Sequence, residues 1–110
     1  MDTNKALAAF FALSQQTRLD VFRLLVKAGS DGLNAGEIAS LLDVKQNTMS
    51  ANLTVLLNAG MVRNERHGRT IRYFADFDAM RALLSFLMED CCGGRPELCQ
   101  PVIDEISCAC

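Results

Sequence analysis

The chain has 110 residues, half of them hydrophobic, and a formal net charge of −2. This length suits one domain with one core, and the apolar content excludes an intrinsically disordered chain. No apolar run approaches the roughly 20 residues that a membrane-spanning helix needs. Residues 1–4 are polar and acidic rather than signal-like, so we expect a cytoplasmic protein with no membrane partner.

The charge is unevenly distributed along the chain. Residues 45–75 carry five basic side chains and one acidic side chain, whereas the segments on either side are acidic. A basic centre in an acidic chain indicates a local anionic partner such as double-stranded DNA. An unevenly charged but merely solvated surface would give the same pattern, so further observations are needed.

Four helices are predicted in the first sixty residues from apolar residues at helical spacing. The first covers residues 4–13, and Ser14 is the predicted cap of a second helix that ends at Gly29. Asn34 and Glu37 have the spacing of a capping box, which opens the third helix. The fourth covers residues 46–58. The residues expected to face inward from the last two helices are Ile38, Leu41, Leu42, Met49, Leu53, Leu56 and Leu57.

The pattern changes after Gly60, where the fourth helix should stop. Residues 61–66 and 70–74 contain β-forming side chains, and the His67-Gly68-Arg69 segment between them predicts a hairpin turn. A long helix follows over residues 76–90. Its apolar stripe consists of Phe77, Met80, Leu83, Leu84 and Leu87. Residues 101–107 could form one more short helix, with Pro101 in its first turn.

This order of elements, α-α-α-α-β-β-α, predicts a mainly α winged helix-turn-helix with a small β-hairpin. The third and fourth helices are joined by a tight turn, and the fourth can enter a DNA major groove. The hairpin can reach the DNA backbone or the minor groove. Residues 1–90 would form the DNA-binding domain, and residues 91–110 a cysteine-rich tail.

The fourth helix is the predicted DNA-reading element. Its outward residues are expected to be Gln46, Asn47, Thr48, Ser50 and Asn52, with Lys45 just before them. Amides and hydroxyls hydrogen-bond base edges and phosphates, although most surface helices also have a polar face. The absence of Asp and Glu between Val44 and Val62 favours DNA, because phosphates would repel acids there.

The hairpin is a second candidate DNA contact. It carries Arg63, Arg66, Arg69 and Arg72, and arginine suits bidentate phosphate binding. Arg66, His67 and Arg69 surround the tip and are the predicted contacts, the alternative being a solubilising wing. His67 is expected to be an exposed hydrogen-bonding side chain rather than a metal ligand, because the chain has no second histidine.

All five cysteines lie in the last twenty residues, at Cys91, Cys92, Cys99, Cys108 and Cys110. Thiolates are soft ligands that select thiophilic ions, and the Gly93-Gly94 pair lets the segment fold back on itself. A cytoplasmic cluster of this kind indicates a metal or redox site rather than a disulfide framework. Zinc prefers four ligands, which five cysteines could supply, and thiol-redox or sulfide chemistry is a further alternative.

The chain resembles the ArsR family of metal-responsive winged-helix repressors. The matching segments are residues 12–19, 37–42, 46–50 and 56–62, together with the hairpin residues 66–69 and Tyr73. The resemblance implies a homodimer built on the first and last helices, which binds an inverted repeat in operator DNA and leaves it when an inducer binds. Separately, the single histidine and the lack of an obvious acid–base pair near it predict that the chain is not an enzyme.

Two metal sites of the family are not expected here. Asn34 and Gly36 stand where many members have a Cys-x-Cys pair, and the last long helix contains no histidine. Cys91 and Cys92 with Cys99 instead resemble the arsenic-responsive subgroup with cysteines after the last helix. The resemblance thus implies As(III) as inducer, with Sb(III) or methylated As(III) as variants. Cys108 and Cys110 are candidate extra ligands, the alternatives being that they are spare or that one of them replaces Cys99 as third ligand.

Overall fold

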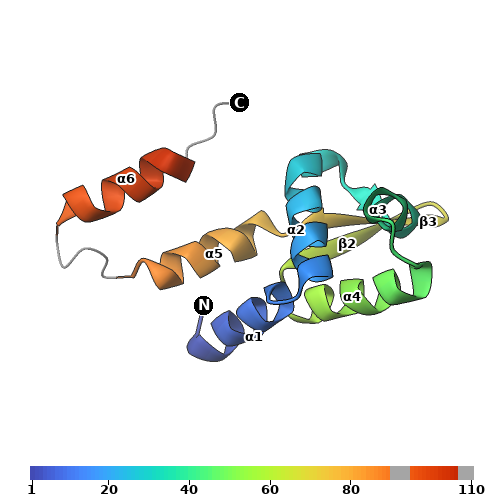
Figure 1. Cartoon of the computed structure of the whole chain (residues 1–110), viewed down its shortest axis with the longest axis horizontal. Coiled ribbons are helices and arrows are strands. Elements are labelled where there is room, and N and C mark those ends of the chain that lie inside the picture. The colour runs from blue at the N-terminus through green and yellow to red at the C-terminus, as the bar shows by residue number, and fades with distance from the viewer. Residues whose placement is uncertain (90–94, 107–110) are drawn as a thin grey trace.

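The computed structural model describes residues 1–89 and 95–106 (Figure 1). The elements in chain order are α1 (Thr3–Leu13), α2 (Gln16–Ala28), the 3-10 turn η1 (Gly29–Asp31), β1 (Leu33–Asn34), α3 (Ala35–Leu42), α4 (Gln46–Asn58), β2 (Val62–His67), β3 (Thr70–Ala75), α5 (Phe77–Leu87) and α6 (Pro96–Ile106). The predicted order of four helices, a hairpin and a long helix is therefore confirmed.

The helix-turn-helix pair is α3 and α4, and local capping explains where α3 begins and ends. Asn34 Oδ1 accepts a hydrogen bond from Glu37 N at 2.8 Å, and Glu37 Oε1 accepts one from Asn34 N at 2.9 Å, which confirms the predicted capping box. Asp43 ends the helix in a left-handed conformation with φ of 55°. The bounds of α4 are those predicted from the sequence.

The predicted cap of α2 was wrong. Gln15 caps this helix, because its side chain accepts a hydrogen bond from Arg18 N at 2.9 Å. Ser14 ends α1 instead, where its hydroxyl donates to the Phe11 carbonyl at 2.8 Å. Only two residues separate the helices, and the Ser14 hydroxyl donates to a carbonyl at the end of α1 that lacks a helical partner.

The sheet has a third strand that the sequence pattern did not reveal. The antiparallel order is β1-β3-β2, with Leu33 opposite Tyr73 and His67 opposite Thr70. Strand β1 has only two residues, too few to show alternation. The hairpin turn is the Gly68-Arg69 pair, and Gly68 has φ of 66°, as the first central position of a two-residue II′ turn requires.

A buried core joins α1–α4 to the sheet and to one residue of α5. Its members are Ala6, Ala9, Ala12, Val21, Phe22, Leu25, Ile38, Ala39, Met49, Leu53, Leu56, Met61, Val62, Ala75 and Leu83. The three alanines let α1 approach the body of the protein closely. Leu41 was expected in the core but is 63% exposed, because α3 has only two turns and buries Ile38 and Ala39 instead.

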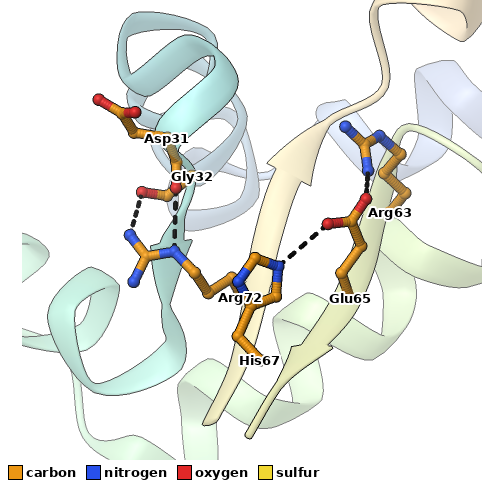
Figure 2. A network of polar contacts seen from close by, with 6 residues as sticks. All are labelled: Asp31, Gly32, Arg63, Glu65, His67 and Arg72. Carbon is orange, nitrogen blue, oxygen red and sulfur yellow. Dashed lines mark hydrogen bonds and ion pairs between the residues drawn. The ribbon is translucent and has the colours of Figure 1, made fainter.

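Gly32 lies where the end of η1 passes against β3. Its φ and ψ are 62° and −175°, and a Cβ there would lie 2.6 Å from the Tyr73 carbonyl oxygen and 2.6 Å from Phe74 Cε1. Arg72 closes the same junction. Its Nε donates to the Asp31 carbonyl and its Nη2 to the Gly32 carbonyl, both at 2.9 Å (Figure 2).

The C-terminal helices differ from their predicted bounds. Helix α5 ends at Leu87, and α6 begins at Pro96 rather than near residue 101, so Pro101 lies inside it. Pro96 occupies the first helical position, where proline is favoured. Both helices extend away from the body of the molecule (Figure 1). In the part of the chain that the structure describes, no helix is long and apolar enough to cross a membrane.

Candidate nucleic-acid interface

The start of α4 presents an exposed polar surface. Of the predicted DNA-reading residues, the exposed ones are Lys45, Gln46, Asn47, Thr48 and Ser50. Lys45 is the N-cap residue but makes no side-chain cap, and the first turn holds no acid. Asn47 Oδ1 accepts a hydrogen bond from Thr48 N at 2.9 Å. The amide-rich start of α4, with its positive helix end, suits an anionic partner.

Asn52 does not belong to this surface, which corrects its predicted outward position. It is 8% exposed, and its Oδ1 accepts a hydrogen bond from Arg18 Nη1 at 3.3 Å. Asn52 follows Met49 by three residues and precedes Leu56 by four, so it shares their buried face. The helical spacing of Asn52 therefore indicates a buried position, whereas its polar side chain is typical of an exposed one.

Two of the four hairpin arginines serve the fold itself. Arg63 Nη1 lies 2.6 Å from Glu65 Oε1, and its guanidinium carbon lies 4.4 Å from the centroid of the Phe74 ring. Arg72 joins β3 to η1, as described above, and its Nη1 lies 3.8 Å from Glu37 Oε1. Neither was among the hairpin residues singled out as DNA contacts at the tip.

His67 and Glu65 form a pair on β2. His67 Nε2 lies 3.1 Å from Glu65 Oε2, and both side chains are about half exposed (Figure 2). Hydrogen bonds with His67 and with Arg63 hold the pKa of the Glu65 carboxyl below its ordinary value. The one acid of the wing is therefore ionised at neutral pH and is screened by two basic neighbours.

Arg66 and Arg69 are the cations that remain available at the wing. Both are exposed, and the side chain of neither makes a hydrogen bond or an ion pair within residues 1–89 and 95–106. The tip of the hairpin and the start of α4 lie at the same end of the long axis of the molecule (Figure 1). These two elements can therefore approach one DNA duplex together.

The predicted metal ligands fall mostly outside the described residues. Cys91, Cys92, Cys108 and Cys110 lie there, and only Cys99, on α6, is described. Cys99 is 6% exposed and disulfide-bonded. Among the described residues no three His, Cys, Asp or Glu side chains are grouped to hold a metal ion. The inducer site thus remains a prediction.

Comparisons with known proteins find a helix-turn-helix domain and similar transcriptional regulators. A family model described as a helix-turn-helix domain matches residues 13–65. The uncharacterised HTH-type transcriptional regulator YbzH of Bacillus subtilis is 31% identical, over 71% of this chain and 90% of that protein. Among solved structures, an ArsR-like transcriptional regulator from Rhodococcus is similar over 97% of this chain and 96% of that chain, with a TM-score of 0.72 at 24% identity.

The chain belongs to the ArsR family of winged helix-turn-helix transcriptional regulators. Two further solved structures are similar to this ArsR-family chain. The homodimeric winged helix-turn-helix DNA-binding domain of Mb0332 from Mycobacterium bovis is 26% identical, covers 79% of this chain and 81% of that one, and has a TM-score of 0.65. The AntR antimony-specific transcriptional repressor is 27% identical, with coverages of 76% and 75% and a TM-score of 0.60.

Membership of the family settles the functional class. ArsR-family proteins are DNA-binding regulators, so the expectation that the chain is not an enzyme is confirmed by its relatives. The contact of DNA with the exposed start of α4 and the tip of the hairpin stays a prediction.

Proposed function

We propose that this regulator is a homodimeric repressor that leaves its operator when trivalent arsenic or antimony binds cysteine thiolates of the C-terminal tail. The observation that carries the proposal is the position of the cysteines. All five follow α5 in the chain, with Cys91 and Cys92 nearest to its end and Cys99 on α6. Helix α5 leads away from the end of the molecule that holds the hairpin tip and the start of α4 (Figure 1). A ligand there can act on DNA binding only through the helices that join the two ends. The operator as target implies action in the cytoplasm.

The exposed apolar faces of α1 and α5 support a dimer. The large side chains that remain exposed on these helices are Leu7, Phe10, Phe11, Phe77, Leu84 and Leu87. Phe11 is 68% exposed, which is unfavourable for an isolated chain because apolar area of this size is normally buried. Mb0332, which shares the fold, is homodimeric. A two-fold dimer would present two α4 helices to an inverted repeat.

Replacing Leu84 with Glu is expected to convert the dimer to a monomer, because the charge would lie in the apolar dimer face. Size-exclusion chromatography with light scattering would measure the mass, and operator affinity should fall with it. Leu41→Glu is the matched control, since Leu41 is an exposed leucine of α3 outside the proposed interface. A Leu84→Glu protein that stays dimeric would place the interface elsewhere.

The proposed inducer ligands are Cys91, Cys92 and Cys99, with Cys108 and Cys110 as additional donors. Three thiolates suit the trigonal pyramidal geometry of As(III) or Sb(III), whose lone pair occupies the fourth direction. AntR, which shares the fold, is an antimony-specific repressor.

The proposed coupling acts through α5. Binding of the ion would order the tail against the end of α5, which is predicted to hold the dimer interface. A change there alters the separation of the two α4 helices, which must match half-sites about one turn, or ~34 Å, apart. A coupling free energy of about 1–3 kcal/mol would weaken operator binding by about 5–150-fold.

A second candidate inducer is an oxidant or a sulfur species. The disulfide at Cys99 favours this reading, because a thiol-redox or sulfide-responsive repressor would use such a bond as its signal. Zinc binding by four of the five cysteines is the remaining form of the metal hypothesis. All of these candidates place the sensor in the same tail.

Operator affinity of the reduced protein, measured by fluorescence anisotropy, tests the proposal. Arsenite or antimonite is expected to weaken wild-type binding by about 5–150-fold, and Cys92→Ser or Cys99→Ser should abolish the response. Mass spectrometry then distinguishes an arsenic adduct from a sulfur crosslink formed with polysulfide. Equal arsenite sensitivity in wild type and both variants would remove these thiols from the switch.

A further inference from the structure

Arg18 joins three parts of the protein through one side chain. From α2, its Nε donates to the Ala12 carbonyl at 2.7 Å, and its Nη1 donates to Asn52 Oδ1 at 3.3 Å. Its guanidinium carbon also lies 5.6 Å from the centroid of the Phe11 ring. The residue therefore connects the last turn of α1 with the middle of α4.

The contact with α1 holds the end of that helix. Ala12 lies in the last turn of α1, where carbonyl groups lack helical partners, and this turn contains no basic residue of its own. Arg18 supplies both a donor and a positive charge at the negative end of the helix. Because the guanidinium is partly buried, solvent screens this interaction less than it would at the surface.

The contact with α4 holds the DNA-facing helix. Asn52 is buried, and Arg18 is the one side chain that contacts its amide oxygen by a hydrogen bond within the described part of the chain. Asn52 comes two residues after Ser50, which belongs to the exposed DNA-facing surface. A shift of the guanidinium would leave a buried acceptor unpaired, so α4 is favoured in one position relative to Arg18.

We propose that Arg18 is a positioning residue that fixes α4 relative to α1 and so sets the half-site spacing that the dimer accepts. The inference rests on the proposed binding of a dimer to an inverted repeat. Phe11, which stacks with Arg18, is exposed on the α1 face proposed for dimerisation. A single guanidinium thus touches both the dimerising helix and the helix that enters the groove.

A series of synthetic operators tests the proposal, with the two half-sites moved apart one base pair at a time. Wild type should prefer one spacing strongly. Arg18→Lys keeps the charge but loses the planar fork that reaches both partners, so the ratio between the best spacing and its neighbours should fall about fivefold, equivalent to about 1 kcal/mol. Asn52→Leu removes the acceptor at similar volume and should flatten the preference in the same way.

Arg23→Lys is the matched control, because Arg23 is an exposed arginine of the same helix. The double variant Arg18→Lys with Asn52→Leu should flatten the preference no further than either change alone, since the two residues share one contact. If Arg18→Lys does not fold, the spacing preference of Asn52→Leu is compared with that of wild type instead.

The outcomes separate this inference from the function on which it rests. A wild-type protein that binds no operator, or that has no spacing preference, contradicts the proposed dimeric repressor. If wild type has a steep preference and the Arg18 and Asn52 variants keep the same ratios while losing affinity uniformly, Arg18 merely stabilises the fold and the inference is overturned.

Discussion

Gly32→Ala is expected to lower the free energy of unfolding by about 2–5 kcal/mol, a large part of the 5–15 kcal/mol typical of a domain. Two effects add. The backbone of Gly32 lies in a region of φ and ψ that is open almost only to glycine, which costs about 1–3 kcal/mol for any other residue. The new methyl group would also overlap the Tyr73 carbonyl oxygen and the Phe74 ring, both 2.6 Å away.

Gly29→Ala is the control for this prediction. Gly29 also has a positive φ, 58°, and stands at the other end of η1, but a Cβ there would meet nothing within 4 Å. Urea denaturation followed by circular dichroism would give both free energies. The difference between the variants measures the steric clash against β3, and equal losses would mean that η1 does not pack against Phe74 as described.

The double variant Arg66→Ser, Arg69→Ser is expected to lose most of the electrostatic part of operator binding. These exposed arginines of the wing are not used elsewhere in the described part of the fold, so both are available to phosphates. The proposed dimer would lose four arginine–phosphate interactions, two from each protomer. At about 0.9 units for each interaction, the slope of log K against log[salt] should flatten by about 3.6 units. At physiological salt, we expect the affinity to fall by about 10–100-fold.

Arg81→Ser serves as the comparison for the wing. Arg81 lies on α5, and in the described part of the chain its side chain makes one exposed ion pair, with Asp78. Replacing Arg81 lowers the net charge of each chain by one without changing the proposed DNA interface. The slope of log K against log[salt] should therefore stay close to the wild-type value. A double wing variant with the wild-type slope would show that the hairpin does not reach the phosphates.

Local signals in the sequence predicted most of the fold. The Asn34–Glu37 capping box, the break at Asp43 and the stop at Gly60 are interactions within a few residues, and each has the predicted effect on a helix. The exposed residues at the start of α4 were found for the same reason. Residues 46–48 precede Met49, the first buried residue of the helix, and Ser50 follows it directly.

The misplaced residues depend on contacts between distant parts of the chain. Asn52 shares the buried face of α4, and the residue that donates to its amide oxygen, Arg18, lies 34 residues earlier, so no local pattern reveals that pairing. Strand β1 exists because Leu33 and Asn34 pair with Tyr73 and Arg72 across the sheet. The sequence likewise placed Arg72 among the arginines of the hairpin, but its guanidinium donates to the carbonyls of Asp31 and Gly32, about 40 residues earlier.

The burial of Asn52 matters for anyone who wishes to retarget this regulator to a new operator. Residues 46–48 and 50 are exposed and do not belong to the buried core. They can therefore be exchanged for those of another regulator with a small loss of stability. Position 52 cannot be transplanted in the same way, because its side chain is matched to position 18. A successful specificity graft must move the two residues together, although they lie on different helices.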